Sequence, residues 1–160
     1  MRAITQSKYG LDSLVLSDIP TPKLHSKQVL VKVEVTSVYA AVLHLITADI
    51  SLVRLFAGLR KPRRRPGQSF AGTVIEIGSE VKDLKVGDRV CGTAPGAFAD
   101  LVVARAKRVA VLPNGVGFDE ASTIPVSAIT ALQAVRKHGQ VGAGQKVLIC
   151  LLYTSPSPRD

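Results

Sequence analysis

The chain has 160 residues, 46% hydrophobic and 21% charged, which is enough for one full-sized core but short for two complete domains. This composition excludes a disordered protein, and an aromatic content of 4% disfavours stacking platforms for single-stranded nucleic acid. The formal net charge of +9 keeps attraction to a polyanion open as an alternative.

Two cysteines, Cys91 and Cys150, are too few for a disulfide framework or a four-thiolate zinc site. They favour a reducing compartment, and we expect a cytoplasmic protein. The amino terminus lacks the apolar run of a signal peptide. The most apolar stretch, residues 40–59, is interrupted by His44, Asp49 and Arg54, so we predict no membrane span.

The first part of the chain has the pattern of short strands. Residues 29–35 (VLVKVEV) place four valines on one face, which predicts a half-buried strand. Further strands are predicted over residues 73–77, 89–91, 97–104 and 108–112. Because glycine and proline turns separate them and no helix alternates with them, the pattern favours an antiparallel barrel or sandwich.

The pattern changes after Pro113. A short helix is predicted over residues 118–122, and a longer one over 126–138 with apolar residues on one face and Gly139 beyond its end. Residues 146–149 (KVLI) predict the start of a buried parallel strand. A barrel followed by a helix and a strand indicates a domain boundary.

Four separated motifs occur in order, namely GSEVKDLKVGDRVCG, GAFADLVVA, LPNGVGFDEAS and PVSAITALQAV…VGAGQKVLI. Together they resemble the medium-chain dehydrogenase/reductase superfamily, in particular its zinc-independent quinone oxidoreductase-like members. The resemblance implies a mostly β fold, in which a GroES-like antiparallel β-barrel (residues 1–124) binds substrate. The C-terminal helix and the first strand of an incomplete Rossmann domain, which binds NAD or NADP, would follow over residues 125–149.

The same resemblance implies the reaction. The intact protein would transfer hydride from NAD(P)H to an enone, a quinone or another small carbonyl compound, and it would be a homodimer. Zinc-dependent relatives carry Cys, Asp and His in a CxxDxH pattern and a later His in GHExxG, and the corresponding positions of this chain are Tyr39, Val42, His44 and Gln68. Only His44 could bind a metal, and a catalytic zinc needs three protein ligands, so we predict no metal site.

Tyr39 is the candidate catalytic residue. Zinc-free relatives often read SVNPxD where this chain reads SVYAAV over residues 37–42, so both family polar residues are lost. A phenolic hydroxyl at Tyr39 could still donate to a substrate carbonyl oxygen and stabilise an enolate. A packing role at a strand end is the alternative.

Three further residues are candidates by position. His44 and Phe56 are predicted to line the substrate pocket, although either could instead pack on a helix face or cap the barrel. Thr130 lies in SAITAL, where the resembling family has a Thr that faces the nicotinamide. A helical Thr can equally bond the carbonyl four residues earlier.

A basic cluster supplies the runner-up function. Residues 60–65 (RKPRRR) contain Pro62 and are followed by Pro66, and these two prolines keep them out of a helix. They could present Arg60 to Arg65 to a polyanion such as nucleic acid, which would make the chain a basic β-barrel binding module. Because no nucleic-acid-binding motif accompanies them, nucleic acid is the less favoured partner and a solvated loop is expected.

The last eleven residues, CLLYTSPSPRD over 150–160, depart from the pattern. The first strand of a Rossmann fold is followed by a GxGxxG turn and a helix, but this segment has no glycine and two prolines. It resembles a translated sequencing adapter, so we expect a non-native, disordered tail; a natural Ser/Pro-rich tail is the alternative. The chain is therefore expected to be an inactive, monomeric fragment that binds no cofactor.

Overall fold

A computed structural model describes residues 1–49, 54–55, 58–63 and 65–150. The chain divides into two units, residues 1–128 and residues 129–160, which are described separately. All strands assigned in the described ranges belong to the first unit. In those ranges no helix combines the length and the apolar character needed to cross a bilayer.

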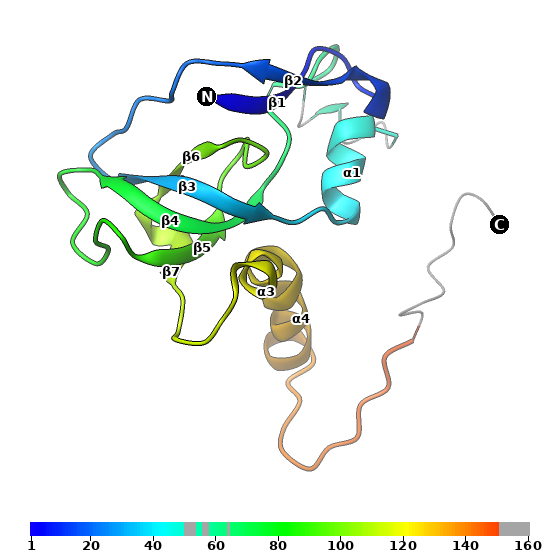
Figure 1. Ribbon diagram of the computed structural model, residues 1–160. Helices are drawn as coiled ribbons and strands as arrows, with labels where there is room; N and C mark the ends of the chain where they lie inside the picture. The colour runs from blue at the N-terminus through cyan, green and yellow to red at the C-terminus, as the bar shows by residue number, and fades with distance from the viewer. Residues whose placement is uncertain (50–53, 56–57, 64, 151–160) are drawn as a thin grey trace. The chain divides into compact units, whose positions relative to one another are not determined.

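The first unit is built from two antiparallel sheets (Figure 1). A hairpin pairs β1 (Arg2–Gln6) with β2 (Leu14–Asp18). The larger sheet has five strands in the order β6-β3-β4-β5-β7. In chain order they are β3 (Gln28–Thr36), β4 (Ser69–Ile77), β5 (Arg89–Thr93), β6 (Leu101–Arg105) and β7 (Val109–Val111). The prediction of a mostly β, antiparallel fold is confirmed.

Strand β3 carries the predicted apolar row. Val29 and Val31 are fully buried, and Val33 packs against the same core. Register shifts against β4 between Leu30 and Val31, and again between Val33 and Val35, mark irregularities that bend and twist a strand. The sheet curls into the half-barrel of Figure 1. Among the described strands β6 and β7 remain edges, so it is open on one side.

The sheet has an apolar core on each face. Neighbouring residues on β4 fall on opposite sides, with Phe70 in the main core and Ala71 in the second, as the two-residue period of a strand requires. Val90 and Cys91 divide in the same way on β5. The main core contains the buried residues Val29, Val31, Phe70, Val74, Leu84, Val90, Ala94, Ala97, Val102 and Ala104.

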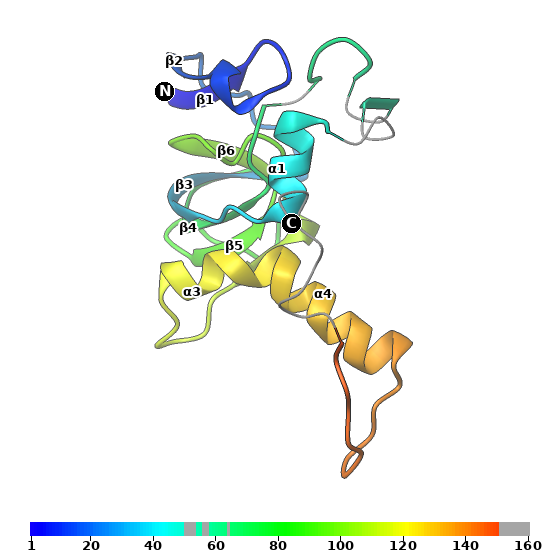
Figure 2. The same cartoon turned by 90° about the vertical axis from the view of Figure 1, so that its right-hand side faces the viewer.

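Helix α3 (Phe118–Thr123) packs against the second face (Figure 2). Ala121 is fully buried there beside Cys91, and the helix predicted over residues 118–122 is confirmed. Helical backbone continues as a π-type segment over Ile124–Ala128. Pro125 lies in this segment and supplies no backbone N–H, which weakens regular α-helical hydrogen bonding there.

Helix α1 (Ala40–Thr47) lies between β3 and β4 in the chain, where no helix was expected, so that prediction is wrong. Val42 and Ile46 are buried four residues apart, on one face of the helix. Leu43 and Leu45 are 41% and 45% exposed on other faces. The segment is apolar almost throughout, so its sequence shows no clean helical stripe, and only burial distinguishes the inner face.

The second unit begins with α4 (Ile129–Leu132) and a π-type segment over Gln133–His138, in agreement with the helix predicted over residues 126–138. The strand predicted over residues 146–149 is wrong, because those residues have no assigned strand structure and Leu148 is 86% exposed. A strand exists through hydrogen bonds to a neighbouring strand, and no described strand pairs with this run.

The two cysteines are expected to react very differently with iodoacetamide. Cys91 is buried in the second core, where burial raises the pKa of its thiol, whereas Cys150 is exposed. Since the thiolate is the nucleophile, the native chain should gain one adduct, at Cys150. Mass spectrometry counts the adducts per chain before and after unfolding in urea. Rapid labelling of Cys91 in the native chain would contradict its place in the core.

Candidate active site

Tyr39 and Gln68 meet where β3 ends and β4 begins. Tyr39 is the residue before α1, and its hydroxyl donates a hydrogen bond of 2.7 Å to Oε1 of Gln68. The two strands are antiparallel neighbours with Thr36 opposite Phe70, so the end of one lies beside the start of the other. Residues 29 positions apart in the chain thereby become one polar pair.

Side-chain and backbone hydrogen bonds hold this corner in place. Thr36 Oγ1 donates to the carbonyl of Ser69 at 2.6 Å, and Ser37 Oγ donates to the carbonyl of Ser122 in α3 at 2.9 Å. The carbonyl of Gln68 accepts from the backbone N–H of Ala94 at 2.9 Å. Because hydrogen bonds hold two residues just before Tyr39 and the backbone of Gln68, we expect the Tyr39–Gln68 bond to be preorganised.

Tyr39 is a hydrogen-bond donor at neutral pH. Its partial burial raises the pKa of the phenol above the ordinary value of 10.0, so the hydroxyl keeps its proton throughout the physiological range. Ser69 Oγ is buried close to the Tyr39 hydroxyl and offsets part of this rise in pKa, although it takes part in none of the hydrogen bonds found within the described residues. The hydroxyl groups of Tyr39 and Ser69 and the amide of Gln68 therefore give this corner uncharged polar groups.

A cavity of about 450 Å³ opens beside Gln68. This volume lies in the range of sites for small organic molecules. Its apolar wall includes Val42, Leu45 and Ile46 of α1 together with Ala94, and Gln68 supplies a polar group. The remaining lining residues are Gln6, Pro62, Arg63, Arg65, Pro66, Gly67, Thr93, Pro95 and Arg108.

Two of the four positions compared above with zinc-dependent relatives are occupied by residues that bond to each other. Tyr39 and Gln68 share a hydrogen bond, and Val42 is buried and apolar. Within the described ranges, no three His, Cys, Asp or Glu side chains come together as a metal site would require. The prediction that this chain holds no zinc still awaits a metal analysis.

Three other residues were predicted to belong to the site, namely His44, Phe56 and Thr130. His44 is exposed on α1 and is not among the described residues that line the cavity. Phe56 lies outside the described residues. Thr130 is exposed in α4 of the second unit, and its hydroxyl makes no hydrogen bond in the described part of that unit. Their roles stay predictions.

Two features of the site were not predicted from the sequence. Gln68 was considered only as a replaced zinc ligand, whereas it is the partner of Tyr39 and part of the cavity wall. The described arginines around the cavity are Arg63, Arg65 and Arg108, and nothing in the sequence connects the segment of the first two with that of the third. These arginines line the same cavity because of the order of the strands in the sheet.

Comparison with known proteins identifies the domain. Residues 25–114 match the family model of the alcohol dehydrogenase GroES-like domain. The chain belongs to the medium-chain dehydrogenase/reductase superfamily. The matched range contains β3 to β7, and therefore the Tyr39–Gln68 pair of this GroES-like domain.

Individual relatives agree with this assignment. The chain is 32% identical over 166 residues to a chloroplast envelope quinone oxidoreductase homolog of Arabidopsis thaliana, covering 97% of this chain and 49% of that protein. The quinone oxidoreductase structure from Coxiella burnetii matches with a TM-score of 0.78 and 30% identity, covering 90% and 46%. A mycobacterial protein complexed with NADPH matches with a TM-score of 0.77 and 25% identity, covering 90% and 43%. This chain thus spans about half the length of these proteins.

Proposed function

We propose that the GroES-like domain is the substrate-binding part of a metal-independent oxidoreductase that reduces an enone, a quinone or a related carbonyl compound with NAD(P)H. The observation that supports it best is Gln68, which lines a cavity of about 450 Å³ and accepts a hydrogen bond from Tyr39, a residue that is not itself among the described lining residues. The quinone oxidoreductases among the relatives, and the NADPH bound by a similar structure, support the reaction class and the cofactor.

The chemistry explains why hydrogen-bond donors matter at this corner. When hydride adds to the β-carbon of an enone, the electron pair of the C=C bond forms a new double bond between the α-carbon and the carbonyl carbon, the π pair of the carbonyl moves to its oxygen, and an enolate forms. A donor aimed at that oxygen stabilises the charge as it develops. The Tyr39 hydroxyl can rotate from Gln68 to this oxygen, and the amide Nε2 of Gln68 offers a second donor. A proton from water then completes the saturated ketone.

We infer that the described residues lack a complete dinucleotide site. Such a site needs a glycine turn between a strand and a helix, where backbone N–H groups hold the pyrophosphate. Residues 145–149 pair with no described strand. Thr130 is the one residue of this chain that we propose as a contact to the cofactor. When bound by the intact protein, the reduced dinucleotide would supply the hydride, with Thr130 toward its nicotinamide.

For the intact protein we place the reaction in the cytoplasm and expect a homodimer with a small carbonyl compound as substrate. The 160-residue chain alone is proposed to be an inactive monomer. A polyanion-binding module is not favoured, because the family match covers the sheet and the site, and none of the relatives described above is a nucleic-acid-binding protein by name.

Tyr39→Phe in the intact protein is expected to lower kcat by about 100-fold, since removal of one donor to a developing oxyanion has this order of effect. The loss appears in kcat more than in KM, because the donor acts on charge that the ground state lacks. Oxidation of NADPH at 340 nm with a quinone and with an enone measures it. Phe keeps the packing of the ring, so Tyr39→Phe with unchanged kcat would refute the role of the hydroxyl.

The 160-residue chain is expected to bind neither NADH nor NADPH at about 100 μM, a concentration at which even weak sites show. One hydrogen bond from Thr130 contributes about 1 kcal/mol, whereas micromolar affinity requires about 8 kcal/mol. Titration of NADPH fluorescence tests this, with the intact protein as the positive control. Saturable enhancement by the 160-residue chain would place a cofactor site within these residues.

A further inference from the structure

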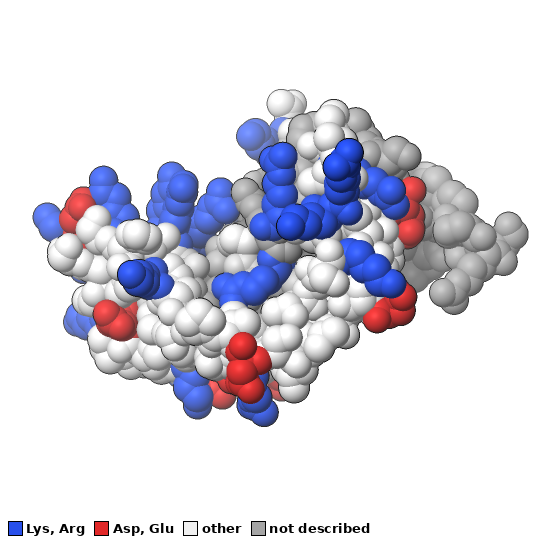
Figure 3. Space-filling view, turned by 90° about the horizontal axis from the view of Figure 1, so that it is seen from above, with Lys and Arg blue, Asp and Glu red and all other residues white. Residues whose placement is uncertain are grey.

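The cavity beside Gln68 has a basic rim. Arg63 and Arg65 reach it from the segment before β4, and Arg108 reaches it from the turn between β6 and β7. No Asp or Glu is among the described residues that line it. The face seen from above in Figure 3 likewise carries many Lys and Arg side chains and few acidic ones. Three of the described residues that line the cavity are therefore positively charged and none is negatively charged.

These arginines have no acidic partners in the described part of the chain. None of the ion pairs found there includes Arg63, Arg65 or Arg108. Arg65 is half-buried and packed against Gly96, where even a Cβ atom would come within 3.2 Å of its Nε. Guanidinium groups gathered around one cavity repel each other, and a bound anion relieves that repulsion.

A solvated basic loop does not explain this arrangement. Arg108 belongs to a different segment from Arg63 and Arg65, separated from them by β4, β5 and β6, yet all three border one cavity. The cavity also contains the apolar residues Val42 and Ile46, which a purely electrostatic surface does not need. Its volume of about 450 Å³ suits one small molecule with an apolar body and a charged end.

We propose that this cavity selects a carbonyl substrate that carries a carboxylate or phosphate group. Arg65 and Arg108 bind the anionic end, with Arg63 adding to the field, and the apolar wall of α1 contacts the hydrocarbon body. Guanidinium groups suit this task because their planar donors bind carboxylate and phosphate in a bidentate manner. The placement of the reacting carbonyl near Tyr39 and Gln68 rests on the proposed function.

The test is a binding measurement on the 160-residue chain with unreactive ketone pairs. The probes are 4-phenylbutan-2-one and its para-carboxylate, with the para-phosphate ester as a third arm that distinguishes the two anions. Titration calorimetry should give at least about tenfold tighter binding of an anionic ketone than of the neutral one. The preference should shrink as NaCl rises from about 50 mM to about 500 mM, because salt screens the attraction.

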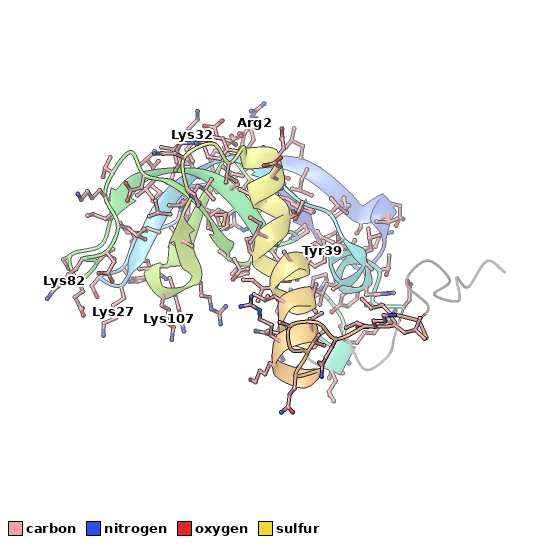
Figure 4. All side chains as sticks on the ribbon, turned by 90° about the horizontal axis from the view of Figure 1, so that it is seen from below. Arg2, Lys27, Lys32, Tyr39, Lys82 and Lys107 are labelled. Carbon is pink, nitrogen blue, oxygen red and sulfur yellow. The ribbon has the colours of Figure 1, made fainter. Side chains whose placement is uncertain are left out.

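Matched variants localise the effect. Arg65→Gln and Arg108→Gln should each remove most of the preference for the anionic ketone while leaving the weak binding of the neutral one. Lys107→Gln, which removes the same charge from the same turn, should leave the preference unchanged, since Lys107 is not among the cavity residues. In Figure 4 Lys107 lies with Lys27 and Lys82, well apart from Tyr39. Melting temperatures of all variants show whether each is folded.

Three results would overturn the proposal: equal affinity for neutral and anionic ketones, no binding of either at about 10 mM, a concentration that detects even very weak sites, or an equal loss in Lys107→Gln. The outcome is separate from that of the proposed function. Anion-selective binding through Arg65 and Arg108, together with an intact protein that oxidises no NADPH, would keep the binding site and refute the reaction.

Discussion

Val31→Asp is expected to lower the free energy of unfolding by about 4 kcal/mol or more, because it places an unpaired carboxylate in an apolar core. Val31 is fully buried, with an exposed fraction of 0%. It lies between two neighbouring strands and pairs with Val74 of β4 and Val102 of β6. A loss of this size is a large part of the total stability of a small domain. The variant should therefore be largely unfolded.

Lys32→Thr is the control for this experiment. Lys32 is the next residue of β3, its side chain is 59% exposed, and its ion pair with Glu34 lies at the surface. Surface pairs of this kind contribute less than about 1 kcal/mol, and Thr suits a strand, so the change should cost little. Urea unfolding followed by circular dichroism compares the two variants. Similar losses at both positions would refute the assigned facing of β3.

The strand pattern of this chain could be predicted where one face of a strand is buried and the other is not. The valines of β3 are the clearest case, since Val29 and Val31 belong to the main core. The hairpin of β1 and β2 was not predicted, because Val15 and Leu16 are 58% and 62% exposed and no alternation marks the strand. The alternation of apolar and polar residues along a strand reflects which side chains are buried. Where the side chains of a strand are only partly buried, the alternation is weak and does not predict the strand.

The candidate site was predictable only in part. Tyr39 was chosen for its hydroxyl and for its place in a family motif, and the structure gives that hydroxyl a partner in Gln68. The partnership depends on the pairing of β3 with β4, and the gathering of Arg65 and Arg108 depends on the whole sheet. Such contacts between distant segments leave no local signature in the sequence.

Gly72 controls how closely β3 and β4 approach, and through them the Tyr39–Gln68 pair. Gly72 lies opposite Val33, and a Cβ atom there would stand 2.0 Å from the carbonyl oxygen of Lys32, which is backbone and cannot rotate away. Gly72→Ala is expected to cost about 3 kcal/mol, at the upper end of the usual range for overpacking. The strands must move apart, so the hydrogen bond at their ends should lengthen.

Two measurements separate the stability effect of Gly72→Ala from its effect on the site. Urea unfolding gives the loss of stability, and the ¹³Cζ chemical shift of labelled Tyr39 in the folded fraction reports the hydrogen bond to Gln68. Gly117→Ala is the control, since a Cβ at Gly117 meets nothing within 4 Å and its φ of −73° suits alanine. That variant should stay within about 1 kcal/mol of the parent. An unperturbed Tyr39 signal in a destabilised Gly72→Ala would mean that the corner is held by Thr36, Ser37 and the backbone of Gln68, independently of the distance between the strands.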